Sequence, residues 1–199
     1  MDKSEKVFDA IYMYYPINLE YDSRKYQESE QTLKRKSKII KKVTSYKQRD
    51  SIIAELEQLL SKCKMIDWTE KDSCCYELKF LLHENQRILD DDIELIESLG
   101  GNRLDLRVFI SVLAPYCYLF VEKTEYDFIM REWRFETVHL YSSETRKATE
   151  SVENFIEKQG YKILSCQEAR KKVENIETEL KNGGQATVFD CLFSDMVSV

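Results

Sequence analysis

Two histidines and six cysteines are the side chains in this sequence best suited to nucleophilic or metal chemistry. His83 and His139 each lie in a segment of strand-like alternation, where a ring needs only a hydrogen bond, and we interpret both as structural. Neither is surrounded by a local signature of a Ser/His/Asp or Cys/His enzyme. A catalytic site would therefore have to be assembled from residues far apart in the chain.

The cysteine spacings do not match a zinc site. No CxxC pair occurs, and the adjacent Cys74 and Cys75 would point to opposite faces of a strand. We interpret the cysteines as small buried apolar residues, and a redox role for the adjacent pair stays open. The sequence predicts no metal and no cofactor.

A run of carboxylates and a group of tyrosines are the candidates for binding a partner. The run "LDDDIE" lacks the glycine and the distal glutamate of a calcium-binding EF-hand loop, so it is either a capped helix start or an acidic patch. The tyrosines of "IYMYYP" are either interface anchors or a lid over the core. The candidate partner-binding residues are Asp90, Asp91, Asp92, Glu94, Tyr14 and Tyr15.

The segment "KRKSKIIKKVTSYKQR" is rich in lysine and could contact phosphates. The same predicted helix carries Leu33, Ile39, Ile40 and Val43, which require a core, so we do not expect nucleic-acid binding. The sequence contains none of the motifs GxGxxG, GxxxxGK[ST], GxSxG and HExxH. A phosphate-cradling loop is therefore not expected.

The net charge of −6 is unevenly distributed, with +4 over residues 1–50 and −10 over the remainder. An acidic body favours a basic protein partner through electrostatic complementarity. The N-terminus does not resemble a signal peptide, and the 14-residue apolar run 108–121 is shorter than the roughly 20 residues that span a bilayer. We expect a cytoplasmic protein with reduced thiols and no membrane contact.

The elements that would position these residues follow from two apolar periodicities. Apolar spacing of the helical kind covers 26–43, 49–64 and 143–159, and a shorter helix within 87–101 ends at a glycine. Alternation with a period of two predicts strands at 74–83, 104–112, 116–126 and 132–141. The first of these strands is expected to be buried on one side, with Glu77 and Lys79 on the other.

The C-terminal segments follow the same two periodicities. A short strand is expected at 161–164, and "SCQE" at 165–168 is a capping box. It should start a helix that reaches Leu180 and ends before Gly183. The tail "TVFDCLF" at 187–193 alternates with apolar residues on both sides, which predicts an interior or helix-covered strand.

These elements predict an α+β protein with a single domain over residues 1–199. Strands in succession favour a mainly antiparallel sheet of about four to six strands with helices packed against it. Residues 1–65 form a mainly helical N-terminal part, and residues 74–199 form a strand-rich part with two later helices.

Three segments together resemble a known class of proteins. They are "YDSRKYQESEQTLKR", "WRFETVHLY" and "GQATVFDCLFSD", and their style is similar to that of the small immunity proteins of bacterial polymorphic-toxin systems. The resemblance implies an acidic, cytosolic, non-enzymatic protein that neutralises a cognate toxin by binding it. No residue-by-residue match exists, so the resemblance assigns no binding residues.

Two other functional classes stay open at this point. One is an enzyme, a hydrolase or transferase, with a Cys/His or carboxylate site assembled from distant residues. The other is a structural or regulatory protein that associates with itself, and the oligomeric state is not determined by the sequence. The leading hypothesis is a binding protein that occludes a protein partner such as a basic toxin domain.

Overall fold

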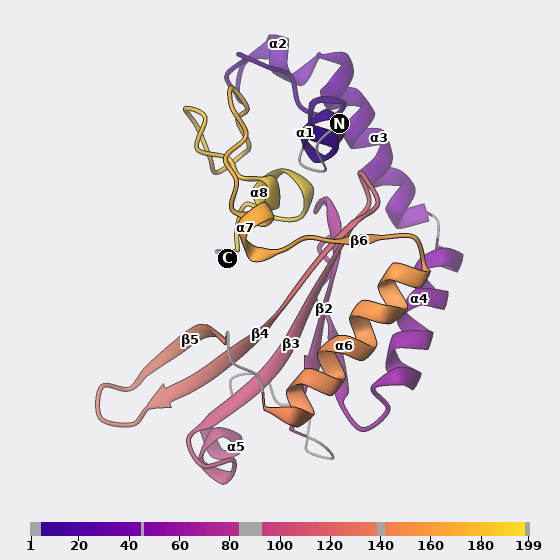
Figure 1. The fold of residues 1–199 in the computed structure, drawn as a ribbon. Coiled ribbons are helices and arrows are strands. Elements are labelled where there is room, and N and C mark those ends of the chain that lie inside the picture. The colour runs from indigo at the N-terminus through magenta and orange to yellow at the C-terminus, as the bar shows by residue number, and fades with distance from the viewer. Residues whose placement is uncertain (1–4, 45, 84–92, 139–141, 198–199) are drawn as a thin grey trace.

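The structure, a computed structural model, describes residues 5–44, 46–83, 93–138 and 142–197. Its centre is a sheet with the strand order β1-β2-β3-β4-β5, in which each neighbouring pair is antiparallel (Figure 1). A short strand, β6, runs parallel to the start of β4. The strands are β1 (Lys64–Asp67), β2 (Cys75–Leu81), β3 (Asn102–Ser111), β4 (Tyr116–Asp127), β5 (Glu132–Val138) and β6 (Lys162–Ile163). The predicted α+β fold with a mainly antiparallel sheet is confirmed.

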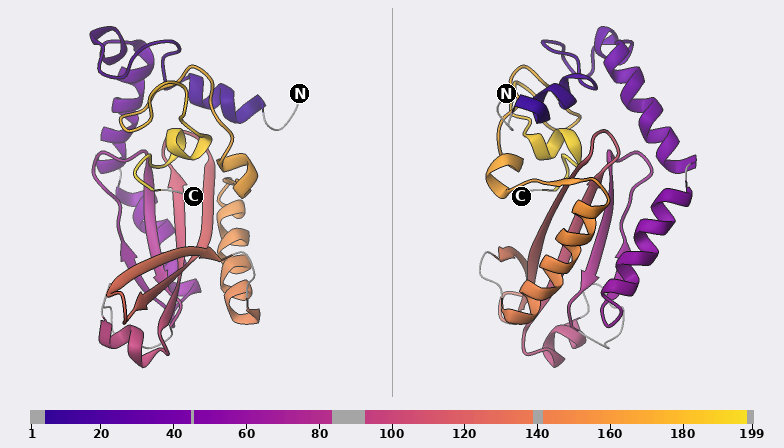
Figure 2. Two further views of the ribbon diagram at one scale, coloured as in Figure 1. Left: turned by 90° about the vertical axis from the view of Figure 1, so that its left-hand side faces the viewer. Right: turned by 45° about the vertical axis from the view of Figure 1, so that its right-hand side comes forward.

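Helices α4 (Tyr46–Leu59) and α6 (Ser143–Lys158) cover one face of the sheet (Figure 2). Their apolar stripes pack against the alternate strand residues that the period-two pattern placed on one side. This layer includes Leu56, Val152, Ile156, Leu78, Phe80, Leu106, Val108, Leu119 and Val121. Ser142 caps the start of α6. Gly160, at φ +88°, follows the end of α6 and is the glycine that the sequence predicted there.

The opposite face is covered at one end by elements from both ends of the chain. Helices α1 (Glu5–Tyr12) and α8 (Val188–Leu192) contact each other there, beside the short α7 (Cys166–Ala169). The ring of Phe109 on β3 lies 5.2 Å from that of Phe189 and 6.3 Å from that of Phe193. The remaining helices are α2 (Arg24–Gln27), α3 (Glu30–Thr44) and α5 (Ile93–Ser98).

The tail prediction is wrong in secondary structure, because residues 188–192 form the helix α8 and not a strand. The Thr187 side chain accepts a hydrogen bond from the Asp190 amide at 3.2 Å, and the Asp190 carboxylate accepts one from the Thr187 amide at 2.7 Å. This reciprocal capping box starts a helical turn. Phe189 and Phe193 are nonetheless buried, as expected for a segment that is apolar on all sides.

The helix predicted to run from Ser165 to Leu180 is also wrong beyond its first turn. The capping box of Ser165 and Glu168 is present, but α7 ends at Ala169. The chain then continues irregularly, and its backbone groups bond to distant segments, with the Val173 amide donating to Ala186 at 2.8 Å. Tertiary hydrogen bonds replace the helical ones here, so the apolar spacing alone was misleading.

The strand predicted to be buried on one side only is buried on both. Lys79 is 1% exposed, although it alternates with Leu78 and Phe80 on the other face of β2. The charged face is covered, so its polar groups require partners within the protein.

Truncation of Phe189 tests the buried tail helix. We expect Phe189→Ala to lower the free energy of unfolding by about 3–5 kcal/mol, the usual cost of removing a buried aromatic ring. Met196→Ala is the control in the same tail, because Met196 is 67% exposed; it should change stability by less than about 0.5 kcal/mol. Urea denaturation measures both, and equal effects of the two substitutions would contradict the packing of α8.

Candidate functional site

The six residues predicted to bind a partner are not brought together as one exposed surface. Asp90, Asp91 and Asp92 lie outside the described residues, and Glu94 is exposed in the first turn of α5. Tyr14 and Tyr15 are each 3% exposed. The acidic patch therefore stays a prediction, and the two tyrosines offer almost no surface to a partner.

Tyr15 instead connects the N-terminal part to the tail. Its hydroxyl donates to the backbone oxygen of Cys191 at 2.8 Å, and the guanidinium of Arg35 lies 4.2 Å from the ring centroid. Burial raises the pKa of Tyr15 well above its usual value of 10.0. The contact stabilises the fold, and it gives Arg35, one of the basic residues of α3, a structural role.

A second basic residue of the same helix is used in the same way. Lys42 is buried, and its ammonium donates to the backbone oxygens of Glu70 and Ser73 at 2.7 and 2.8 Å. Of the six basic residues in the lysine-rich segment 34–42, Arg35 and Lys42 thus stabilise the fold, while Lys34, Lys36, Lys38 and Lys41 are exposed. Two of the basic residues thus have structural roles, and the other four face solvent.

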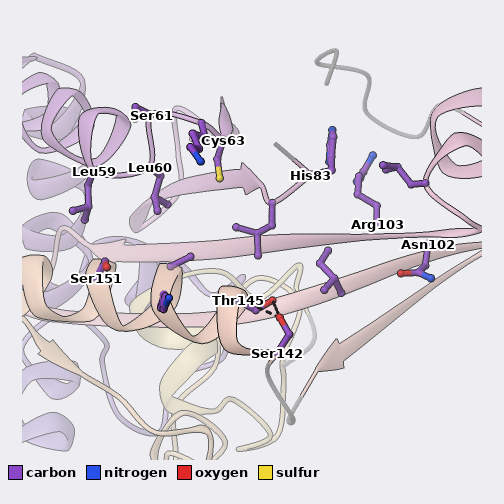
Figure 3. Close-up of a pocket in the computed structure, with 16 residues that line it drawn as sticks. Leu59, Leu60, Ser61, Cys63, His83, Asn102, Arg103, Ser142, Thr145 and Ser151 are labelled. Atoms are coloured by element: carbon purple, nitrogen blue, oxygen red, sulfur yellow. Dashed lines mark hydrogen bonds between the residues drawn. The ribbon is translucent and has the colours of Figure 1, made fainter. Parts of the chain in front are cut away.

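A cavity of about 890 Å³ lies between the end of α4 and the start of α6 (Figure 3). It brings together Cys63, from the segment before β1, and His83, which follows β2. Figure 3 shows both on the side of the cavity across from Ser142 and Thr145 of α6. His139 lies outside the described residues, so His83 is the histidine that the structure places at a cavity.

Among the described residues that line the cavity, the charged ones are Lys62, Arg103 and Lys147. Arg103 is already paired with Asp105 at 2.9 Å. Within the part of the chain that the structure describes, no group of three His, Cys, Asp or Glu side chains could hold a metal ion.

All six cysteines are free thiols, and three of them are buried. Burial raises the pKa of Cys75 and of Cys191 well above the usual value of 9.0, and it also raises the pKa of Cys74. A thiol with a raised pKa carries little thiolate, which is the reactive form. The environment of Cys74 and Cys75 therefore disfavours a reactive pair.

A buried ionic cluster occupies the face of the sheet opposite α4 and α6. Asp105 is fully buried, and its carboxylate lies 2.9 Å from Nε of Arg103 and 3.4 Å from Nζ of Lys79. Beside it, Arg107 pairs with Glu77 and with Glu122. The cluster is thus neutral, with three cations and three anions from the strands β2, β3 and β4.

The ring of Trp68 lies against this cluster. Its centroid is 4.3 Å from Nζ of Lys79 and 4.9 Å from Cζ of Arg107, which are directly opposite each other on β2 and β3. The ring face attracts both cations and offsets part of their mutual repulsion. Burial raises the pKa of Asp105 despite the lowering effect of Lys79 and Arg103. This cluster holds the strands in register and contains no open site.

The most exposed large apolar residue described, Ile129, lies at the tip of the hairpin that joins β4 to β5. Phe128 is 48% exposed, Ile129 is 91% exposed and Met130 is 61% exposed. We call these three residues the hairpin tip. Figure 1 shows that the hairpin extends beyond the helical layers. Three consecutive large apolar side chains at a protruding turn are unusual for a surface that contacts only water.

Hydrogen bonds that one aspartate accepts fix the conformation of the hairpin tip. Oδ1 of Asp127 accepts from the amides of Ile129 and Met130, both at 3.0 Å, and Oδ2 accepts from Arg134 at 2.7 Å. The two backbone hydrogen bonds lower the pKa of Asp127. Arg131 completes the turn in the left-handed region, at φ +56°. The tip is therefore preorganised, which reduces the entropy lost when it binds.

Sequence reasoning did not identify the hairpin tip. The segment "DFIMRE" between two predicted strands carried a usable signal, because aspartate at the first position of a turn bonds to amides further along. Three large apolar residues in such a connection should have been read as exposed. The absence of glycine and proline in this segment concealed the turn.

Fold and surface together define an α+β protein whose principal exposed apolar feature is a preorganised β-hairpin. Among the residues described, no helix is both long and apolar enough to cross a membrane. Comparison with protein-family models, curated proteins and solved structures finds no match to this chain.

Removal of the central carboxylate tests the ionic cluster. Asp105→Ala leaves the buried cations Lys79 and Arg103 without their shared carboxylate, and we expect it to reduce the free energy of unfolding by about 3–5 kcal/mol. Glu28→Ala is the control, because Glu28 forms a largely exposed ion pair with Arg24. Chemical denaturation should show a change of less than about 1 kcal/mol for the control. A similarly small loss for Asp105→Ala would show that the cluster is dispensable.

Thiol labelling tests the buried cysteines. With a water-soluble disulfide reagent at neutral pH, we expect Cys75, Cys117 and Cys191 to stay unlabelled in the native protein, because burial raises the pKa of each. All six thiols should react after unfolding. Mass spectrometry of the digested protein identifies the labelled residues, and rapid native labelling of any of the three would contradict their placement.

Proposed function

We propose that this protein is a non-enzymatic binding protein whose hairpin tip inserts into an apolar depression on a protein partner. The observation that supports this most directly is the 91% exposure of Ile129 on a turn held by Asp127. An apolar side chain held in one conformation gains affinity because little conformational entropy is lost on association. Residues of this kind at a protrusion act as the central anchors of an interface.

The chemistry of the partner follows from the charge of the chain. The net charge of −6 raises the rate of encounter with a basic surface and lowers it with an acidic one. The proposed partner is therefore a basic protein domain with an apolar depression. Together with the resemblance to immunity proteins, this supports an inhibitor in the cytoplasm that occludes a toxin. The tip would contribute residence time and the acidic body would contribute association rate.

A second candidate is an enzyme that uses the cavity, because Cys63 and His83 both line it. In a Cys/His hydrolase or transferase, the imidazole would activate the thiol as a nucleophile. Under this alternative, alkylation of Cys63 in the wild-type protein is faster than in a His83→Ala variant at neutral pH. Equal rates of alkylation in the two proteins exclude it.

Substitution of the hairpin tip tests the proposed function. The full-length chain is used as bait to isolate its partner from the native host. The two are then co-produced, and growth and the dissociation constant of the complex are measured. We expect Ile129→Asp to abolish protection and to weaken binding by about thirtyfold or more, the usual effect of losing a central anchor. Its thermal stability should be unchanged, since the Ile129 side chain is exposed.

Leu180→Asp is the matched control for this experiment. It makes the same change from an apolar to an acidic residue at a site that is 55% exposed and lies outside the hairpin. Full protection is expected. Protection and affinity that survive Ile129→Asp, or that are lost equally with Leu180→Asp, would show that the tip is not the binding site.

A further inference from the structure

Strand β5 has one paired edge and one open edge. Its residues pair with β4 from Val138 to Glu132, and no other strand of the described chain lies beside it. Figures 1 and 2 show it at the border of the sheet. An open edge presents unpaired N–H and C=O groups, and it readily accepts a further strand. At the middle of β5, Phe135 is 56% exposed.

The sequence of β5 is self-complementary in an antiparallel pairing. N–H and C=O groups of alternate residues point to opposite edges, so an added strand must match outward-pointing residues with one another. A two-fold axis at Phe135 satisfies this for all seven residues of the strand. It places Arg134 opposite Glu136 of a second copy, and Glu136 opposite its Arg134. Phe135 then lies opposite Phe135 of the second copy.

Other registers are worse in both overlap and charge. A two-fold axis at Arg134 pairs only five residues and sets Arg134 opposite its own copy and Glu132 opposite Glu136. An axis at Glu136 also pairs five residues and sets Glu136 opposite Glu136. Like charges directly across a strand pair repel. Larger shifts leave three residues of β5 paired.

The charges continue in register into the neighbouring strands. Within one copy, Glu125 on β4 lies opposite Arg134, and Lys123 lies opposite Glu136. In the Phe135-centred register, one row on a single face reads Glu125, Arg134, Glu136 and Lys123, with the last two from the second copy. The row thus alternates in sign across four strands. Arg134 already donates to Asp127 from one nitrogen, and its guanidinium has further donors for a second carboxylate.

We propose that β5 pairs antiparallel with β5 of a second copy of this chain, on a two-fold axis at Phe135, so that two sheets join into one. The support is the alternating row of charges, the overlap of all seven residues and the exposed phenylalanine on the axis. A two-fold interface uses the same surface patch on both copies, as this register does. The pairing goes beyond the proposed binding function and uses the edge of β5, whereas that function uses the hairpin tip.

Charge reversal of the full-length chain tests this pairing. Sedimentation velocity over a wide concentration range should show a reversible monomer–dimer equilibrium for the wild type. Arg134→Glu alone and Glu136→Arg alone each set like charges opposite each other twice. We expect each to raise the dimer dissociation constant by about tenfold or more. Arg24→Glu, at a side chain that is 86% exposed, is the control and should leave the constant unchanged.

Mixing the two variants separates the pairing from any effect on the hairpin itself. In a heterodimer of the Arg134→Glu and Glu136→Arg chains, every cross-strand pair is again of opposite charge. Native mass spectrometry of the mixture should show the heterodimer in excess over both homodimers.

Three outcomes overturn the proposal. They are a wild-type monomer at every concentration, single variants that dimerise as the wild type does, and a mixture that forms no excess heterodimer. A monomeric wild type would mean that β5 does not pair with a second copy. Single variants that dimerise normally would mean that the dimer contacts lie elsewhere.

Discussion

The antiparallel pairing of β3 with β4 is the constraint on which the rest of the structure depends. The two strands are matched from Asn102 opposite Glu125 to Ile110 opposite Cys117, and most of their side chains are buried on both faces. A strand pair that is buried on both sides requires a covering layer on each. Helices α4 and α6 supply one layer, and segments from the two ends of the chain supply much of the other.

The two faces of the sheet are covered through different kinds of interaction. The face under α4 and α6 is apolar where these helices cover it, so packing there needs no specific partners. The other face changes from aromatic rings near α8 to the ionic cluster around Asp105. Charged groups that are removed from water require defined partners, so this cluster favours one register of β2, β3 and β4 over its alternatives. Apolar packing under α4 and α6 therefore stabilises the fold, whereas the ionic cluster on the opposite face selects the strand register.

The register of β4 against β3 also determines where the hairpin tip and the edge of β5 lie. β4 continues past Glu125, the residue opposite the first residue of β3, Asn102. The hairpin extends beyond the helical layers, and its tip and the edge of β5 are accessible together (Figure 1). The tip is apolar and held by Asp127, whereas the edge carries alternating charges. The two surfaces suit different partners, so one hairpin could serve recognition and self-association at once.

The elements that the sequence predicts correctly are those with local signals. Alternation located β2 to β5, helical spacing and glycine located the end of α6, and Ser165 with Glu168 formed the expected capping box. The hairpin tip carried a local signal only in Asp127 at the start of its turn. The burial of Tyr14 and Tyr15 cannot be read from residue type, because it depends on which distant segments lie above them.

The secondary structure of the tail depends on tertiary contacts as well as on its sequence. Residues 187–193 carry apolar side chains on both faces, and a segment of this length fits a buried strand and a buried helical turn equally well. The local capping box of Thr187 and Asp190 starts the helical turn, and the rings of Phe109 and Tyr118, which meet Phe189 from the sheet, bury it. The same reason applies to Lys79, since burial is a property of what packs against a residue, and periodicity describes only the direction in which that residue points.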